Sequence, residues 1–315
     1  MRIFLAGATG AVGSRLLQLL VAAGHAVVGT TRTGSKAAAL RAAGAEPVVV
    51  DGLDHTALRS VVIDAKPDIV IDELTALGGV PDLRRFDRYF AMTNRLRSEG
   101  LDILLASAQE AGARRFIAQS YCGWPYARIG SPVKDEDAPL DADPPRAFKT
   151  TLAAIRHLEN RVAGARGIEG MALRYGAFYG PGTGMLDESV LDAVRRRRLP
   201  LIGDGGGWWS FLHVEDAAAA TALAIEHGAP GIYNIVDDEP APVSAWLPVL
   251  ADILGARRPR RVPRWLARAV IGDHFVAMMT GARAGTNARA KAALDWRPRY
   301  PSWRQGFRAV LAPTR

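Results

Sequence analysis

The chain is poor in the side chains that build disulfides and metal sites. Its 315 residues include a single cysteine, Cys122, and six histidines, and no Cys/His cluster has the spacing of metal ligands. One cysteine cannot form an internal disulfide, and without a ligand cluster we expect no metal centre.

Long hydrophobic runs are missing as well. No stretch approaches the roughly 18 apolar residues of a membrane-spanning helix. Residues 1–7 lead directly into glycines, without the apolar region and cleavage site of a signal peptide. Hydrophobic residues make up 49% of the chain and charged residues 23%, which is typical of a globular enzyme and not of a disordered chain. We therefore expect a compact cytoplasmic protein with no membrane partner.

Basic residues exceed acidic ones, but the excess is spread along the chain. Lys and Arg number 40 against 32 Asp and Glu, and the one dense run is the four arginines at residues 195–198. This run ends an apparent helix, where cations complement the helix dipole. A solvated helix end is the simpler interpretation, and a patch for phosphate or nucleic acid is the alternative. Because no recognition motif accompanies the run, we expect no nucleic-acid partner.

Short runs of β-branched residues alternate with Ala/Leu-rich segments in the first half of the chain. This alternation is typical of β-α-β units and predicts a parallel sheet. Residues 12–23 have apolar side chains at helical spacing and precede Gly24, a residue that often follows a helix end. We expect strands at residues 2–6, 26–30, 46–50, 69–72, 115–119 and 170–174. The predicted fold class is α/β, a Rossmann-type doubly wound parallel sheet.

The second half of the chain is richer in glycine. The stretches at residues 179–184 and 203–207 have the composition of loops at the rim of a site or at a domain junction. The remaining predicted elements are a short strand at residues 231–236 and helices at residues 245–254 and 264–271. We predict a dinucleotide-binding domain over residues 1–175, to which residues 211–236 return. A smaller, mainly substrate-binding region is expected over residues 176–315.

A glycine turn stands between the first predicted strand and the first predicted helix. Gly7, Gly10 and Gly13 have the spacing G-x-x-G-x-x-G. Glycines permit a tight turn and let backbone N–H groups approach a pyrophosphate, while the helix N-terminus favours its negative charge. A plain turn is the alternative, but the strand-turn-helix context indicates dinucleotide binding. The residues expected to bind the cofactor here are Gly7, Thr9, Gly10, Ala11, Val12 and Gly13.

The end of the second predicted strand indicates which dinucleotide binds. An NAD site usually has a carboxylate there for the ribose 2′-hydroxyl, whereas residues 30–36 contain none and include Arg32 and Lys36. Two cations and several hydroxyls are typical of a 2′-phosphate pocket, so we expect NADP rather than NAD. The alternative is that both cations are merely solvated. Asp51, directly after the third strand, is placed to bind the adenine end, although an acidic residue there is also a common helix cap.

Five segments later in the chain carry further patterns in a fixed order. They are residues 111–117, the R-Y-x-x-x-Y-G-P-G pattern at 174–182, the F-x-H-V-x-D pattern at 211–216, residues 233–235 and residues 294–298. Together with the glycine turn, they make the chain resemble the extended short-chain dehydrogenase/reductase family, the NAD-dependent epimerase/dehydratase group. The resemblance implies a Rossmann fold, a nicotinamide cofactor, and oxidoreductase, epimerase or dehydratase activity. Many relatives form dimers, so a homodimer is among the expectations.

The family's catalytic pair is missing from the place where the resemblance puts it. The family uses Tyr-x-x-x-Lys on a helix, where Lys lowers the pKa of the phenol so that Tyr moves a proton while nicotinamide moves a hydride. The matching region is residues 143–154. If the family's Tyr is aligned with Ala147, Thr151 stands at the position of the family's Lys. If the Tyr is aligned with Phe148, Leu152 stands at that position. Neither register contains the pair.

The end of the fifth predicted strand has a phenol that is a candidate replacement. The family's catalytic Ser or Thr falls at Ser120 or Tyr121, and Lys149 is near enough along the chain to perturb the phenol. The catalytic candidates are therefore Tyr121, Ser120 and Lys149. The alternative is that Tyr121 only packs in an aromatic lid with Trp124 and Tyr126.

The segment before F-x-H-V-x-D bears on the substrate. Sugar-nucleotide members of the family commonly have an arginine there that pairs with phosphate, whereas Trp208 and Trp209 stand in an uncharged stretch. Two indoles suit an apolar or ring-containing substrate. We predict an NADP(H)-dependent oxidoreductase acting on a small apolar or ring-containing carbonyl, alcohol or enone, with Tyr121 or Ser120 polarising the oxygen. Two alternatives stay open, a sugar-nucleotide epimerase or dehydratase and a non-catalytic NADP(H)-binding sensor.

Overall fold

A seven-stranded sheet forms the centre of the computed structural model, which describes residues 1–78 and 86–312. All its strands are parallel, in the order β12-β7-β5-β4-β1-β2-β3. The strand order reverses between β1 and β4, which makes the sheet doubly wound, as the β-α-β alternation predicts. The strands are β1 (Arg2–Ala6), β2 (Ala26–Thr31), β3 (Glu46–Val49), β4 (Ile69–Asp72), β5 (Arg115–Tyr121), β7 (Glu169–Tyr175) and β12 (Gly231–Ile235).

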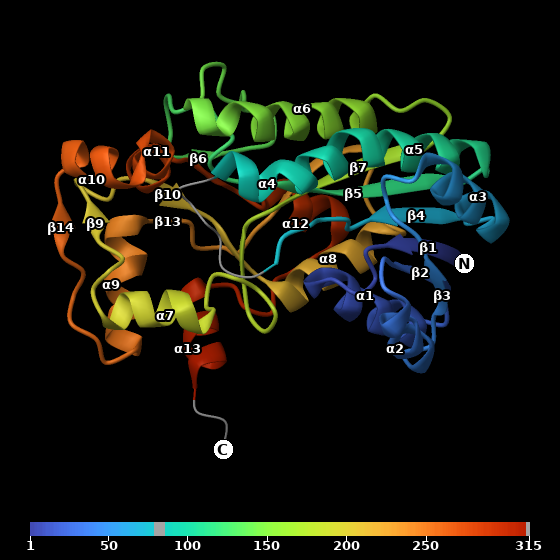
Figure 1. The fold of residues 1–315 in the computed structure, drawn as a ribbon, viewed down its shortest axis with the longest axis horizontal. Helices are drawn as coiled ribbons and strands as arrows, with labels where there is room; N and C mark the ends of the chain where they lie inside the picture. The colour runs from blue at the N-terminus through green and yellow to red at the C-terminus, as the bar shows by residue number, and fades with distance from the viewer. Residues whose placement is uncertain (79–85, 313–315) are drawn as a thin grey trace.

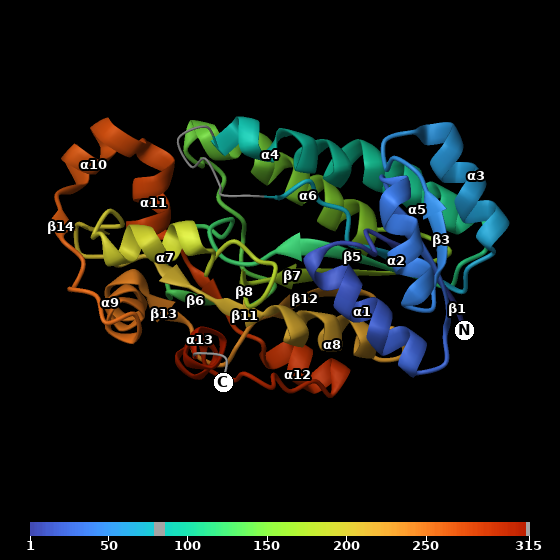
Figure 2. The same ribbon diagram turned by 60° about the horizontal axis from the view of Figure 1, so that its bottom comes forward.

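Helices cover both faces of this sheet (Figure 1). One face carries α1 (Ala11–Ala22), α2 (Ala37–Ala42), α8 (Val214–Ala224) and α12 (Ala288–Leu294). The other carries α3 (His55–Ala65), α5 (Leu101–Glu110) and α6 (Lys149–Ala163), with α4 (Phe86–Arg95) and the π-helix η3 (Leu96–Gly100) running into α5. The turned view in Figure 2 shows the same two layers, with α4, α5 and α6 on one side and α1 and α8 on the other.

The hydrophobic pattern explains why these elements form. In β1 the side chains of residues 3–6 are all buried, because a parallel strand covered on both faces needs a continuous apolar run. In α1 the buried residues Leu16, Leu17 and Leu20 recur at helical spacing on the face toward the sheet. The predicted strands and the first helix are confirmed, with ends that differ by at most two residues. The largest difference is in β5, which continues through Ser120 and Tyr121.

The second half of the chain builds a separate hydrophobic cluster at the end of the molecule opposite the N-terminus (Figure 1). Trp246, Phe211, Trp303 and Phe307 are fully buried in it. Its helices are α7 (Glu188–Arg195), α9 (Val243–Ile253), α10 (Arg264–Ile271), α11 (Asp273–Gly281) and α13 (Trp303–Leu311). Its short strands are β8 (Ala177–Tyr179), β9 (Leu201–Ile202), β10 (Trp208–Trp209), β11 (Phe211–His213), β13 (Ala241–Pro242) and β14 (Arg261–Val262).

The chain returns to the sheet through β12, which pairs with β7. The smaller elements are η1 (Gly34–Lys36), β6 (Val133–Lys134), η4 (Arg146–Phe148) and β15 (Ala284–Gly285). The domain boundary at residue 175 stays a prediction. Over residues 1–78 and 86–312, no helix has the length and hydrophobicity that crossing a membrane requires.

Candidate functional site

A cleft of about 1080 Å³ opens at the carboxyl ends of β1, β2, β4 and β5. Ligands of open α/β sheets bind at this edge, next to the point where the strand order reverses. The structure brings eight of the nine predicted cofactor residues into the wall of this one cleft. They are Gly7, Thr9, Gly10, Ala11, Val12, Gly13, Arg32 and Lys36.

The glycine turn has the shape of a phosphate cradle. Gly7 has a left-handed φ of +86°, and a Cβ on it would lie 2.7 Å from the carbonyl oxygen of Glu73. A Cβ on Gly13 would lie 2.2 Å from the carbonyl oxygen of Gly7, so the turn and α1 approach each other too closely for a side chain. Gly10 precedes α1 without a side-chain cap, which leaves the first N–H groups of the helix open to an anion. These residues fit a dinucleotide pyrophosphate.

Arg32 and Lys36 lie at the end of β2 with exposed side chains. Across the part of the chain that the structure describes, neither side chain has a hydrogen bond or ion pair. The β2 end itself is fixed by Thr30, whose hydroxyl accepts a hydrogen bond of 3.0 Å from the Gly7 N–H. Two unpaired cations beside the phosphate cradle suit a ribose 2′-phosphate.

Asp51 lies outside the residues that line the cleft. Its side chain is exposed, and Oδ1 accepts a hydrogen bond of 2.9 Å from the backbone N–H of Leu53. The preceding residue, Val50, does line the cleft. Asp51 as a ligand of the adenine end therefore stays a prediction.

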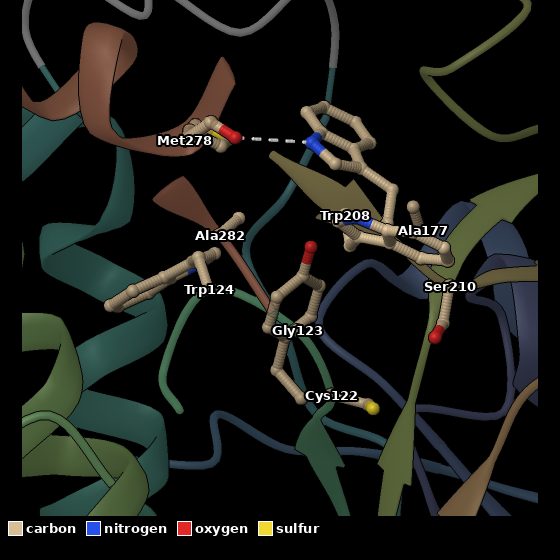
Figure 3. A pocket seen from close by; sticks show the side chains of 10 residues that line it. Cys122, Gly123, Trp124, Ala177, Trp208, Ser210, Met278 and Ala282 are labelled. Carbon is tan, nitrogen blue, oxygen red and sulfur yellow. Dashed lines mark hydrogen bonds between the residues drawn. The ribbon is translucent and has the colours of Figure 1, made fainter. Parts of the chain in front are cut away.

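Tyr121 lies in a narrow aromatic pocket next to the cleft. The pocket holds about 10 Å³, close to the space of one water, and shares Ala177, Trp209 and Met278 with the cleft wall. Trp124 and Trp208 lie on opposite sides of it, and the Trp209 indole N–H donates a hydrogen bond of 3.2 Å to the Met278 carbonyl (Figure 3). The Tyr121 ring lies 6.3 Å from the Trp124 ring, centroid to centroid.

The environment of Tyr121 makes its phenol a weak acid. Burial raises its pKa well above the ordinary value of a tyrosine, and the Arg97 guanidinium opposes this only in part. The phenol is therefore a hydrogen-bond donor at neutral pH rather than a phenolate. Both interpretations of Tyr121, as proton donor and as part of an aromatic lid, are compatible with this position.

Ser120 and Lys149 lie apart from both cavities. The Ser120 side chain is buried and its hydroxyl donates a hydrogen bond of 2.7 Å to Glu159, which is ion-paired with the buried Arg174. Lys149 begins α6 with an exposed side chain, 3.7 Å from the Asp143 carboxylate. Neither residue is among those that line the cleft or the Tyr121 pocket. Of the three predicted catalytic residues, the structure brings only Tyr121 to the site.

Helix α6 and the η4 turn before it contain the residues that the family resemblance aligns with Tyr-x-x-x-Lys. The only lysine of α6 is Lys149, and the helix contains no tyrosine. Its buried face presents Leu152, Ile155 and Thr151, whose hydroxyl accepts a hydrogen bond of 3.0 Å from the Asn94 side chain.

Two adjacent buried carboxyls, Asp72 and Glu73, lie at the end of β4 and were missed by the sequence reasoning. Burial raises the pKa of Asp72 to about 7 and that of Glu73 to about 8. Glu73 lines the cleft, and its Oε1 accepts a hydrogen bond of 2.8 Å from the Tyr175 hydroxyl. In the sequence, these two acids are recognisable only because they directly follow the apolar run of residues 69–71.

Arg97 is a buried cation near Tyr121 that the sequence reasoning also missed. It lies in the π-helix η3, a helix form that recurs at functional sites. Its Nε has no hydrogen-bond partner within the described residues. Burial lowers the pKa of Arg97 to about 10, and the charges of Glu159 and Asp72 oppose that effect. No sequence pattern distinguishes this arginine from the exposed ones.

The wall of the cleft beyond the cofactor residues is largely apolar. Aromatic rings and methionines from the α4 end and from the second half of the chain form it: Tyr89, Phe90, Trp209, Trp246, Phe275, Met278 and Met279. Such a wall suits a flat aromatic or aliphatic ring.

Comparisons with known proteins connect this site to a family. Residues 3–236 match the NAD dependent epimerase/dehydratase family. A 3-diazoavenalumate denitrifying reductase from a Streptomyces species is 44% identical over 312 residues, covering 98% of this chain and 99% of the relative.

Solved structures show the same fold at lower identity. The Thermotoga maritima UDP-glucose 4-epimerase, solved with UDP-glucose, superposes with a TM-score of 0.75 at 21% identity, covering 98% of this chain and 97% of that one. A human epimerase family protein solved with NADPH superposes with a TM-score of 0.74 at 20% identity, covering 100% of both chains. Both confirm the Rossmann-type architecture.

Proposed function

The chain belongs to the NAD dependent epimerase/dehydratase family, and within that family we propose that it is an NADP(H)-dependent reductase of a small aromatic substrate. The chain matches the family model, and it is 44% identical over nearly its whole length to a reductase. These two findings indicate that the protein is an NAD(P)-dependent oxidoreductase with a nicotinamide cofactor. The preference for NADP, the substrate and the roles of residues are the proposal. A cytoplasmic location and a homodimer stay predictions from the sequence.

The cofactor half of the proposal is supported by the cleft. The glycine turn would hold the pyrophosphate, and Arg32 and Lys36 would pair with a 2′-phosphate. The strand end has no carboxylate that would favour a ribose 2′-hydroxyl. When bound, NADPH supplies a hydride.

The substrate class that we propose is an aromatic diazo compound. The observation that carries this choice is that α6 contains no tyrosine beside its one lysine, since a hydride delivered to an aryldiazonium needs no accompanying proton. The reaction balances as aryl–N₂⁺ plus NADPH giving aryl–H, N₂ and NADP⁺. The carbon–nitrogen bond breaks, the hydride becomes the new aryl C–H, and dinitrogen leaves with its bonding electrons. The name of the Streptomyces relative, 3-diazoavenalumate denitrifying reductase, supports the same class.

A carbonyl substrate is the second candidate, and Tyr121 is the observation in its favour. Reducing a carbonyl requires a proton on the oxygen as well as a hydride on the carbon. Tyr121 lines the pocket that adjoins the cleft and keeps its phenolic proton at neutral pH. Because its pKa is raised, Tyr121 is a weaker acid than the tyrosine of the family's Tyr-x-x-x-Lys pair.

The proposal is tested by comparing the two reactions on matched substrates. The purified protein is incubated with NADPH and either a carboxybenzenediazonium salt or formylbenzoate of matched ring substitution. We expect NADPH oxidation with N₂ release and benzoate formation from the diazonium, and transfer of deuterium into the ring from NADPH deuterated at its hydride position. Turnover of formylbenzoate alone would replace the diazo assignment with a carbonyl one. Turnover of UDP-glucose alone would indicate a sugar-nucleotide epimerase. NADPH binding without turnover of any of the three substrates would indicate a non-catalytic sensor.

A further inference from the structure

Two arginine-rich segments that are far apart in the sequence lie side by side at the end of the molecule opposite the N-terminus (Figure 1). The first is the run at residues 195–198, which begins at the last residue of α7, and the second is residues 257–261 before α10. The Arg197 side chain donates a hydrogen bond of 3.0 Å to the carbonyl of Arg258, 61 positions away. Parallel pairing of β9 with β14 fixes the contact, and the Leu201 N–H donates a 2.9 Å hydrogen bond to the Arg260 carbonyl.

Most of these arginines have no carboxylate partner. Arg195 and Arg196 pair with Glu188 and Asp192 of α7, respectively. The other six, which we name the arginine patch, form no ion pair with any described residue. They are Arg197, Arg198, Arg257, Arg258, Arg260 and Arg261. All are exposed except Arg197, which is half-buried. A cluster of one sign without counter-charges attracts an anionic partner and repels a second copy of itself.

Helix α10 follows the patch directly and presents apolar side chains to solvent. Trp265 is 71% exposed, Val270 55% and Leu266 40%. Ala267 is the only fully buried residue of α10. Arg264 and Arg268 lie among these side chains, each paired with one carboxylate, Asp204 and Asp273 respectively. An exposed tryptophan and aliphatic residues bordered by arginines are typical of a segment that lies in a lipid interface.

We propose that the arginine patch and the exposed face of α10 form a docking surface for an anionic lipid bilayer. The arginines would contact lipid headgroups, and Trp265, Leu266 and Val270 would enter the region between headgroups and acyl chains. The apolar face argues for lipid over nucleic acid, because a phosphate backbone engages the cations but gives these three side chains no apolar partner. Association of this kind is peripheral and reversible. It needs no membrane-spanning helix and does not depend on the proposed reaction. It replaces the expectation, drawn from the missing hydrophobic runs, that the protein has no membrane partner.

The surface lies next to the apolar end of the cleft. Helix α11 follows α10 directly, and its residues Phe275, Met278 and Met279 line the cleft. The Arg268 guanidinium of α10 pairs with the Asp273 carboxylate at the start of α11, which joins the two helices. A docked bilayer would therefore be nearer to the substrate end of the cleft than to the glycine turn.

The test is sedimentation of the full-length protein with vesicles. Phosphatidylcholine vesicles are compared with vesicles that also contain phosphatidylglycerol, at low and at high salt. We expect at least tenfold more bound protein on the anionic vesicles and loss of the difference at high salt. The triple variant Arg257→Glu, Arg258→Glu, Arg260→Glu should abolish binding, and Trp265→Ser should weaken it at least threefold.

A charge-matched control keeps the test specific. The triple variant Arg41→Glu, Arg88→Glu, Arg166→Glu makes the same change in net charge at exposed arginines away from the patch, and should bind vesicles like the unmodified protein. NADPH affinity should be unchanged in the patch variants and serves as the check of folding. Equal binding to both kinds of vesicle, or equal loss in the control variant, would overturn the proposal. So would binding of duplex DNA as tight as vesicle binding with no effect of Trp265→Ser, which would indicate a nucleic-acid surface.

Discussion

Ser120 and Glu159 are joined by a buried hydrogen bond of 2.7 Å from the serine hydroxyl to the carboxylate. The two oxygens of the same carboxylate accept hydrogen bonds of 2.7 Å from Nε and Nη2 of Arg174. The hydroxyl of Ser120, one of the two residues that the resemblance offers for the family's catalytic Ser or Thr, is thus bound to a structural ion pair, whereas the other, Tyr121, lines the pocket beside the cleft. Neighbouring side chains of a strand point to opposite faces, which accounts for the division.

This division predicts different effects for two conservative substitutions. Tyr121→Phe should lower carbonyl reduction by roughly 100-fold, the usual scale of general acid catalysis, and leave diazonium turnover within about threefold. Ser120→Ala should leave turnover per folded molecule unchanged and reduce the free energy of unfolding by about 1 to 3 kcal/mol, because Glu159 loses a buried donor. Steady-state kinetics on both substrates and chemical denaturation measure these effects. Equal losses on the two substrates in Tyr121→Phe would contradict the assignment, and loss of NADPH binding would make Tyr121 a packing residue.

Cofactor choice is expected to depend on Arg32. NADP(H) should bind at least tenfold more tightly than NAD(H), because the guanidinium can pair bidentately with a 2′-phosphate. Arg32→Asp should reverse or abolish this preference, while Arg41→Asp, at an exposed position of the following helix, should preserve it. Calorimetric titration of all three proteins with both cofactors makes the comparison. Tighter binding of NAD(H) by the unmodified protein would refute the prediction.

A side chain at position 10 should leave the fold intact but prevent the cofactor from binding. A Cβ there would lie 3.2 Å from the carbonyl oxygen of Gly7, a contact that a small shift relieves, yet the side chain would stand between the helix N-terminus and the phosphates. Gly10→Val is therefore expected to keep the circular dichroism spectrum and lose NADPH affinity by at least 100-fold. Gly24→Ala, which meets no atom within 4 Å but has a φ of +78°, serves as the comparison and should lose stability only. A folded Gly10→Val protein with unchanged affinity would place the phosphates elsewhere.

The fold and the glycine turn could be predicted because their signals are local. Residues 7–13 and Arg32 belong to one β-α-β unit, and each strand carries its own apolar run. The pocket around Tyr121 has no such signal, since Ala177, Trp209 and Met278 come together only through the packing of the second half of the chain. The π-helix that holds Arg97 likewise depends on tertiary packing. The joining of the two arginine segments depends on the β9–β14 pairing, which no sequence period indicates.

The carboxyls of Asp72 and Glu73 give the protein a stability that depends on pH. Burial raises their pKa values to about 7 and about 8, above the ordinary values of 3.8 and 4.5. Between about pH 4 and pH 8 these two carboxyls therefore bind more protons in the folded state than in the unfolded state, so their contribution to the free energy of unfolding falls as pH rises through this range. The loss amounts to roughly 1.4 kcal/mol for each unit of difference between the folded and unfolded pKa.

Glu73→Gln isolates the larger contribution. The amide oxygen can still accept the hydrogen bond from Tyr175, but the buried group no longer ionises, so the decline in thermal midpoint between about pH 5 and about pH 9 should become clearly shallower than in the unmodified protein. Glu226→Gln, an exposed carboxyl on the surface, should leave the decline unchanged. Calorimetric scans of the three proteins across this pH range provide the measurement. An equal slope in Glu73→Gln and the unmodified protein would show that burial does not hold Glu73 protonated in the folded state.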